Sequence, residues 1–311
     1  MKSRKIIADL HNHSTASDGE YTPSELVLKA REIGLKAMAL TDHDTIAGLD
    51  EAVSSGHKSG IKVIPGIEVS IRFRRPFFVG TLHLLLYFSE ALLKDTGFRD
   101  DLSSIVSKGR GLTLVMDRID AINSEFGPEG REPLLARPLS IDEITSQGDN
   151  ITRRHFFMAL SKNHDITDRG RIDRIIGNNS PAYISSGIDM NRLKPLIERY
   201  PVVKVLAHPA AGSFPGESHY NEVHPPIDVV ERLLPELLAP GIIGIDGIEV
   251  YYPAHTEELE EILFDWVRRY DLLITGGSDC HDRENRPLGI KGMDQGELDK
   301  LLERIEGSIF P

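Results

Sequence analysis

The chain has 311 residues, of which 40% are hydrophobic and 27% charged, and its formal net charge is −12. This composition is typical of a globular protein, and the length suits one α/β barrel with an insertion. The acidic charge argues against binding of duplex DNA, which depends on neutralising phosphates with Lys and Arg. The single cysteine, Cys280, excludes a disulfide framework and fits a reducing cytoplasm.

The sequence also argues against contact with a membrane. No apolar run approaches the roughly 20 residues of a membrane span, and residues 1–5 lead into only a short apolar run before Asp9. Such a start lacks the apolar centre of a signal peptide. We therefore expect a cytoplasmic protein that acts away from membranes, and the sequence leaves its oligomeric state open.

Two histidines follow the first predicted strand. Residues 6–8 form the short apolar run of a buried strand, and His11 and His13 come just after it. Side chains two residues apart in an extended chain point to the same side, so both imidazoles can bind one ion. An isolated His-x-His is as often a pair of solvated loop residues, and the later part of the chain has to decide.

Strands and helices alternate after this motif. Thr22, Pro23 and Glu25 form a helix-start pattern, which predicts a helix to about residue 33. A strand, a helix and a strand are expected next, at residues 37–40, 49–55 and 62–69. This alternation indicates a parallel sheet. Barrel enzymes of this kind carry their active sites at the carboxyl ends of the strands.

The second half of the chain predicts an insertion and then a return to the barrel. Residues 81–88 predict a fourth strand, and from residue 89 to 184 the strand and helix rhythm is lost. The barrel pattern returns at residues 202–209, 244–251 and 272–281. We therefore expect a barrel domain of residues 1–88 and 185–311. Residues 89–184 are expected to form a mainly helical insertion that caps the active-site mouth.

Nine metal-ligating side chains lie at or near the predicted strand ends. They are His11, His13, Asp18, His43, Glu68, His83, His208, Asp279 and His281. Imidazole suits Zn, Fe and Mn, and carboxylates also admit Mn, so the set predicts two or three divalent ions. Cys280 lies between two of these residues, and strand alternation turns its thiol into the core.

Other residues of similar type are left outside the predicted site. Glu249 lies one strand away from the motifs, and Asp282 is interpreted as a loop charge. The remaining histidines stand in polar segments without partners at ligand spacing, and surface positions are expected for His57, His164, His219, His224 and His255.

The motifs together resemble the PHP (polymerase and histidinol phosphatase) family of metal-dependent phosphoesterases. The likeness rests on His83 and on the motifs at residues 9–13, 17–19, 41–44, 65–68, 207–209 and 278–281. It implies a distorted (β/α)7 barrel with a trinuclear metal centre, holding manganese first, with zinc or iron as alternatives.

The resemblance also implies how the ligands are shared, with Glu68 as a bridge. The first ion would be held by His11, His13, Glu68 and Asp279. The second would be held by Asp18, His43 and His281. The third would be held by Glu68, His83 and His208.

Residues 152–155 of the insertion resemble a subgroup that includes 3′,5′-nucleoside bisphosphate phosphatases and 5′-to-3′ exoribonucleases. The planar fork of an Arg side chain matches phosphate oxygens. Arg153, Arg154 and His155 are therefore expected to bind substrate together with Asp18 and His281. The alternative is a basic patch at the start of a solvated helix.

The expected reaction is hydrolysis of a nucleotide phosphate monoester, most specifically the 3′-phosphate of 3′,5′-bisphosphonucleotides, by a hydroxide that bridges two ions. Asp18, His281, Arg153 and His155 are the expected catalytic residues, with His281 or His155 protonating the leaving oxygen.

Three alternatives stay open. A 5′-to-3′ exonuclease on short 5′-phosphorylated RNA would need a basic strip, for which the candidates are Arg72, Arg74, Arg75 and residues 108–110. A phosphatase of another small molecule, such as histidinol phosphate, would use the same metal centre. A domain that uses its metals only for stability is disfavoured, because a structural role does not need an open multinuclear set.

Overall fold

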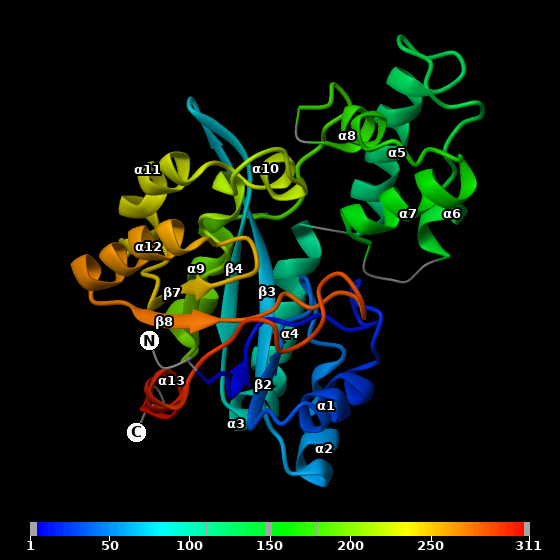
Figure 1. Cartoon of the computed structure of the whole chain (residues 1–311). Helices are drawn as coiled ribbons and strands as arrows, with labels where there is room; N and C mark the ends of the chain where they lie inside the picture. Colours follow the sequence, from blue (N-terminus) through cyan, green and yellow to red (C-terminus); the bar gives the residue numbers. More distant parts are fainter. Residues whose placement is uncertain (1–4, 110, 147–150, 178, 308–311) are drawn as a thin grey trace.

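The computed structural model describes residues 5–109, 111–146, 151–177 and 179–307 of the chain (Figure 1). Residues 1–4, Arg110 and Asn150 therefore lie outside the described residues, and so does the side chain of His219. An eight-stranded sheet forms the centre of the described part. Its strands are β1 (Ala8–Asp9), β2 (Ala37–Leu40), β3 (Lys62–Arg75), β4 (Phe78–Tyr87), β5 (Ile188–Asp189), β6 (Val203–Leu206), β7 (Gly247–Tyr251) and β8 (Leu273–Gly276).

The sheet nearly closes into a barrel. Neighbouring strands follow the order β1-β2-β3-β4-β6-β7-β8, and β5 pairs with β3 outside this path. At the far ends, the Leu10 amide donates to the Gly276 carbonyl at 3.2 Å, and Asn12 forms a bridge with Cys280. The predicted α/β barrel is confirmed, with the first and last strands meeting where the predicted ligand motifs begin.

The parallel order expected from the first three strands is confirmed, but β4 departs from it. This strand is antiparallel to both β3 and β6, while β1, β2 and β3 are parallel to one another, and so are β6, β7 and β8. β3 and β4 extend further than expected, so only Pro76 and Phe77 separate them. A two-residue connection permits only an antiparallel pair, because a parallel one needs a crossover of a dozen residues.

Alternate residues of the strands pack into two different cores. Ala39 and Leu85 belong to the core inside the barrel, while Met38 and Leu84 belong to the core between barrel and helices. Helix α13 (Gln295–Gly307) adds Leu298 to the inner core, together with Leu301 and Ile305. This helix closes the amino ends of the strands, so the barrel opens for function at the carboxyl ends.

Helices cover the outside of the barrel. At the first of them, the Glu25 amide donates to Thr22 Oγ1 at 3.2 Å and the Thr22 amide donates to Glu25 Oε2 at 2.9 Å, which confirms the predicted helix start. The second extends past the expected residue 55, because Gly60 ends it with a left-handed φ of 76°. These helices are α1 (Pro23–Glu32), α2 (Leu49–Ser59), α3 (Glu90–Leu93), α4 (Thr96–Val106), α9 (Met190–Arg199), α10 (His219–Val223), α11 (Ile227–Leu238) and α12 (Glu257–Tyr270), with 3-10 turns at Ser107–Gly109 and Ala211–Ser213.

The insertion has a hydrophobic core of its own. Residues from Val115 to Ala182, including Phe126 and Phe156, form a cluster separate from the barrel cores, and Figure 1 shows this part in green beside the barrel. Its helices are α5 (Leu112–Phe126), α6 (Ile141–Thr145), α7 (Arg153–Asn163) and α8 (Arg169–Ile176). α3 and α4, although they fall within residues 89–184, pack on the barrel core through Leu93 and Phe98. No helix of the described residues is both long and apolar enough to cross a membrane.

Candidate metal centre

Asp9, at the end of β1, joins the loops that leave β1 and β8. Its buried carboxylate accepts the amide N–H of Ser278 at 2.9 Å and that of Gly289 at 2.8 Å, and burial raises its pKa to about 6. Gly277 passes so close to His11 that an added Cβ would lie 2.4 Å from the His11 Cβ. Glycine at this position therefore lets the β8 loop reach His11 without a clash.

Asp42 orders the segment that follows His13. Its carboxylate accepts from the Ser14 amide and hydroxyl, both at 2.7 Å, and from the Ser17 hydroxyl at 2.6 Å. These bonds fold residues 14–17 back against the loop after β2. Asp18, which comes next in the chain, is thereby brought to the barrel mouth.

Asp44 fixes the loop on the other side of His43. Its carboxylate accepts from the Ser70 amide and hydroxyl of β3, both at 2.8 Å, and its own backbone has a left-handed φ of 50°. His43 also forms a bridge with Glu68. The loop after β2 is thus held directly over the end of β3.

Glu68 lies at the centre of five histidine rings. The ring nitrogens of His43, His13 and His11 lie 2.9, 3.2 and 3.3 Å from its Oε2. Those of His83 and His208 lie 2.9 and 3.0 Å from its Oε1. The two oxygens of one buried carboxylate therefore face two different groups of imidazoles.

His83 reaches this centre from the middle of β4 and not from a strand end. It pairs in register with Ser70 of β3, and its carbonyl accepts the Ala207 amide at 3.0 Å. Because β4 runs against its neighbours, its middle lies level with the end of β6, where His208 follows. The expectation that every ligand-type residue lies at a strand exit is therefore wrong for His83.

Asp279 and Asp18 complete the ring of ligand-type side chains. Asp279 Oδ1 lies 3.1 Å from His13 Nε2 and 3.2 Å from His281 Nδ1, and Asp18 Oδ1 lies 3.4 Å from His281 Nε2. Asp279 and His208 both have left-handed backbones, with φ of 48° and 32°. Such conformations in residues other than glycine occur often at functional sites, where the surrounding structure maintains them.

The charges of the site compensate one another. Burial would raise the pKa of Glu68, but His43, His83 and His11 hold it well below its usual value. Burial would likewise lower the pKa of His13, but the carboxylates of Asp279 and Glu68 raise it to about 9. Burial does lower the pKa of His43, to about 4, so this ring is neutral at pH 7.

The donor set fits divalent cations. The Nε2 atoms of His11 and His13 and the Oε2 atom of Glu68 are buried and make no well-formed hydrogen bond within the described residues. Buried polar atoms normally have partners, and an ion would supply one. Three groups of ligand atoms are close enough to hold an ion: His13, Asp18, His43 and His281; His11, His13 and Asp279; and His43, Glu68 and His83.

Glu249 was wrongly left outside the site. It lies on β7, is fully buried, and its Oε1 is 3.1 Å from His11 Nδ1, while its Oε2 accepts the His208 amide at 2.8 Å. It thus orients one histidine ring and the backbone of another. No short motif marks this residue, and only its place in an apolar strand, where a carboxylate needs a partner, indicated a role.

Replacing Glu249 by glutamine should weaken metal binding without abolishing the fold. Carboxylates that orient a ligating histidine typically contribute 10- to 100-fold in metal affinity, and we expect a loss of that size. Competition with a chelating dye would measure it. Unchanged metal affinity would show that the contact to His11 has no influence on the ions.

Asp282, predicted to be a loop charge, is buried and accepts hydrogen bonds from the backbone of its own loop. Its Oδ1 accepts the amides of Glu284, Asn285 and Arg286 at 3.0, 2.5 and 3.2 Å. These three bonds fix the course of the chain directly after His281.

The histidines expected at the surface divide into several groups. His57 is 62% exposed beside Glu90, as predicted. The side chain of His164, 3.4 Å from Glu143, is only 1% exposed, against the prediction. His255 is also buried, and it accepts the Ala210 amide at 3.2 Å. His224 is half-buried with its ring centroid 4.4 Å from that of His208. The prediction failed where tertiary contacts cover polar segments.

The insertion meets the barrel mouth at the start of α7. Arg154 Nη2 lies 3.4 Å from Glu20 Oε1, and Arg154 Nη1 lies 4.0 Å from Asp282 Oδ2. Both carboxylates belong to the loops that carry Asp18 and His281. Arg154, expected as a substrate-binding residue, therefore makes ion pairs between the insertion and the rim of the site.

His155 caps the start of α7. The Thr152 amide donates to its Nδ1 at 3.0 Å as part of a capping box, and the ring is buried. This contact fixes the tautomer and orientation of the ring, so a contact with substrate would have to use Nε2.

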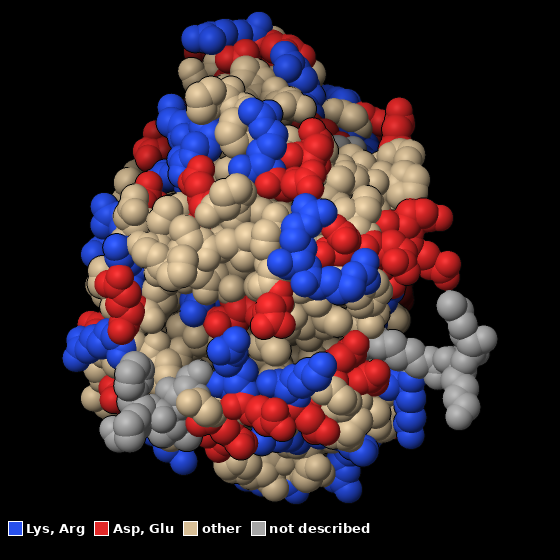
Figure 2. Space-filling model, turned by 90° about the vertical axis from the view of Figure 1, so that its left-hand side faces the viewer, with Lys and Arg blue, Asp and Glu red and all other residues tan. Residues whose placement is uncertain are grey.

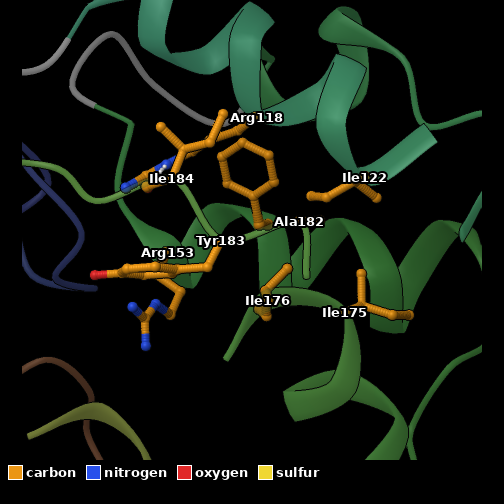
Figure 3. Close-up of a pocket in the computed structure, with 9 residues that line it drawn as sticks. Arg118, Ile122, Arg153, Ile175, Ile176, Ala182, Tyr183 and Ile184 are labelled. Carbon is orange, nitrogen blue, oxygen red and sulfur yellow. Dashed lines mark hydrogen bonds between the residues drawn. The ribbon is translucent and has the colours of Figure 1, made fainter. Parts of the chain in front are cut away.

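Arg153 lines a pocket in the insertion (Figure 3). Its guanidinium carbon lies 5.7 Å from the ring centre of Tyr183, and Figure 3 shows Tyr183 between Arg153 and Arg118 in this view. The volume is about 30 Å³, with Ile122 and Ile175 among the apolar walls. Arg118, which lies on α5 with no motif around it, was not predicted as a site residue.

Cys280 lies in the main hydrophobic core, as expected. Burial raises the pKa of its thiol from 9.0 to about 12. The thiolate is the reactive form, so at pH 8 the folded protein should react with a thiol reagent about a thousandfold more slowly than the unfolded chain. Stopped-flow labelling with and without guanidinium chloride checks this, and rapid native labelling would contradict it.

The site combines a barrel, an open ring of buried imidazoles and carboxylates, and a basic helix start at the rim of that ring. This combination defines a metal-dependent hydrolase of the barrel type. A comparison with known protein families narrows this class to one family. The family model described as the PHP domain matches residues 9–200 of the chain. The chain belongs to the PHP family and is a metal-dependent phosphoesterase.

Known relatives agree with this assignment. The chain is 28% identical over 277 residues to a 5′-3′ exoribonuclease of Haemophilus influenzae, covering 88% of this chain and 89% of the relative. It is 43% identical over 67 residues to a 3′,5′-nucleoside bisphosphate phosphatase of Chromobacterium violaceum, covering 22% and 24% of the two chains. A solved structure from Bifidobacterium adolescentis, described as a candidate metal-dependent phosphoesterase, superposes with a TM-score of 0.70 at 25% identity, covering 96% of both chains.

Proposed function

We propose that this phosphoesterase acts on nucleotides and removes the 3′-phosphate of 3′,5′-bisphosphonucleotides. The observation that carries the proposal is the pairing of a buried multinuclear donor set with an arginine-bearing helix start at the same rim. A bisphosphonucleotide presents one phosphate for hydrolysis and a second for recognition, so it needs both features. The matching segment of the bisphosphate phosphatase from Chromobacterium violaceum supports this substrate class.

The donor set would hold three ions, with manganese as the expected element. His11, His13, Glu68 and Asp279 would hold the first, Asp18, His43 and His281 the second, and Glu68, His83 and His208 the third. The division of the five histidines between the two oxygens of Glu68 supports its role as a bridge. Ions bound in this way make water more acidic and neutralise charge on phosphoryl oxygens.

Asp18 and His281 would act in proton transfer at the reacting phosphate. Their side chains face each other at 3.4 Å, and His281 Nδ1 lies 2.9 Å from the Asp279 carbonyl. If Nδ1 donates to that carbonyl, Nε2 is left either to bind the second ion or to exchange a proton on the side of Asp18, and one use excludes the other at any moment. His155, the alternative proton donor, is buried in the helix cap and so is less suited to this role.

Arg153 would bind the phosphate that is not hydrolysed. Burial lowers the pKa of its guanidinium, which reflects the cost of keeping this cation away from water. The planar fork of this guanidinium matches phosphate oxygens, and a bound phosphate would place an anion beside the buried cation. The neighbouring aromatic ring of Tyr183 supports the planar group from one side.

A second candidate is a 5′-to-3′ exonuclease on short 5′-phosphorylated RNA. The relative from Haemophilus influenzae, which matches most of the chain, favours it. The basic strip that this activity would use has weak support: Arg72 and Arg74 are exposed on β3, but Arg75 is paired with Glu236 and Arg110 lies outside the described residues. On the face in Figure 2, Lys and Arg alternate with Asp and Glu.

Phosphate release from manganese-loaded protein tests both candidates. The substrates are a 3′,5′-bisphosphonucleotide, a 5′-mononucleotide, histidinol phosphate and a short 5′-phosphorylated RNA, with metal content measured on the same sample. Preference for the bisphosphonucleotide is expected. Release of successive mononucleotides from the RNA at a higher kcat/KM would favour the exonuclease, and preference for histidinol phosphate would contradict both nucleotide assignments.

A further inference from the structure

Arg286 is a cation inside the metal site that the proposed reaction has not used. Its Nη1 donates to Asp279 Oδ2 at 2.5 Å, and its side chain is 23% exposed. Burial lowers the pKa of the guanidinium, but Asp279 raises it above the usual value, so the side chain stays charged. The site therefore holds a fixed positive charge at the barrel rather than on the insertion.

Asp279 divides its two oxygens between different partners. Oδ1 faces the imidazoles of His13 and His281 at 3.1 and 3.2 Å. Oδ2 accepts from Arg286 and from the hydroxyl of Tyr252, the latter at 2.8 Å. With two donors on Oδ2, only Oδ1 is presented to the ring of ligand-type side chains, so the carboxylate is held as a one-oxygen ligand.

The guanidinium has further N–H donors besides those on the nitrogen that meets Asp279. Within the described residues, the Arg286 side chain makes one hydrogen bond, which Nη1 donates to Asp279. Besides Asp279, the strongest charges that act on it belong to Tyr252, Tyr220 and Asp18, and Asp18 is itself one of the ligand-type side chains. The Arg286 amide donates to Asp282 Oδ1 at 3.2 Å, which holds the Arg286 backbone in place before any ligand arrives.

From this geometry we infer that Arg286 positions Asp279 with Nη1 and binds an oxygen of the substrate phosphate with its outer N–H groups. A guanidinium suits both tasks because its donors form a rigid planar fork. The inference rests on the proposed phosphoesterase chemistry for its substrate, but not on which nucleotide is hydrolysed.

The test separates the two contacts of Arg286 by comparing two variants. Arg286→Gln removes the charge and the outer donors, whereas Tyr252→Phe removes only the other hydrogen bond to Asp279 Oδ2. Calorimetric titration of manganese-loaded protein with inorganic phosphate gives the affinity, and titration of the metal-free protein with Mn²⁺ gives the metal affinity. Arg283→Gln is the matched control, because Arg283 lies in the same loop, is 56% exposed and stacks on Tyr21.

We expect Arg286→Gln to lower phosphate affinity by about 10- to 100-fold, the usual range for a lost hydrogen bond between charged groups. Tyr252→Phe should weaken Mn²⁺ binding by about 10-fold and leave the phosphate affinity of the loaded protein unchanged. The control should match the wild type in both. An Arg286→Gln protein that binds phosphate as tightly as the wild type would overturn the inference.

A second variant, which keeps the positive charge, tests the inference even if Arg286→Gln does not fold. Arg286→Lys keeps the charge, but one ammonium group cannot match the fork that meets Asp279 and a phosphate oxygen together, so an affinity loss of at least about 5-fold is expected. Wild-type affinity in this variant would also overturn the inference. Because phosphate binding needs no turnover, failure of the wild type to hydrolyse any nucleotide would reject the proposed function and leave this comparison intact.

Discussion

Replacement of Glu68 by glutamine is expected to remove at least one bound ion and to lower kcat/KM by a factor of about 10³ or more, roughly 4 kcal/mol of transition-state stabilisation. The reason is its central position, where one oxygen faces His43 and the other faces His83, both at 2.9 Å. Glutamine keeps the size of the side chain but loses the charge and one acceptor. Metal analysis of the purified variant and steady-state kinetics measure the two effects.

The same measurements on neighbouring variants sharpen this prediction. His83→Ala and His208→Ala should each lose metal together with activity, because both rings face the same oxygen of Glu68. Glu236→Gln is a suitable control, since this residue pairs with Arg75 outside the donor set. Full metal content and full activity in Glu68→Gln would reject the central role of this carboxylate.

Replacement of Arg153 by alanine should lower kcat/KM on the nucleotide substrate by about 10- to 100-fold, the usual cost of losing a hydrogen bond to a charged group. The metal content should stay unchanged, because Arg153 lies in the insertion beside Tyr183 and not among the ligand-type side chains. Kinetics with the bisphosphonucleotide and with the 5′-mononucleotide, combined with metal analysis, test this. The effect should be larger for the substrate with two phosphates.

Arg171→Ala provides the matched control for Arg153. Arg171 belongs to the same insertion but donates to the Leu134 carbonyl from an exposed position on α8. Its loss should leave the kinetics near those of the wild type. If Arg153→Ala hydrolyses every nucleotide tested with wild-type kcat/KM, Arg153 does not bind substrate phosphate.

The local signals in the sequence were sufficient for several elements. Thr22 and Glu25 marked the start of α1 because a capping box depends only on residues three apart. The antiparallel course of β4 was not found, because it depends on how far β3 and β4 extend toward each other. Strand length is set by pairing with neighbours, and a single strand does not carry that information.

The ligand-type residues could be found from local motifs, whereas the residues that support them could not. His11, Asp18 and His43 stand in dense polar motifs after apolar runs, a pattern that is visible one segment at a time. Glu249, Asp282 and Arg286 are single polar residues whose partners lie elsewhere in the chain or in the turn of a loop. A polar residue without a motif reveals its role only when its neighbours in space are known.

The sequence by itself determined the class of fold, the kind of chemistry and the nine candidate ligands, because strand periodicity and ligand motifs are local properties. Only the tertiary structure decided how those ligands divide around the two oxygens of Glu68. It also decided that Glu249 and Arg286 belong to the site and that Arg154 pairs with the barrel rim. Apart from the contact between Arg286 and Asp279 within one loop, these contacts join residues far apart in the chain. Burial and charge acquire their energies only after the chain has brought such residues together.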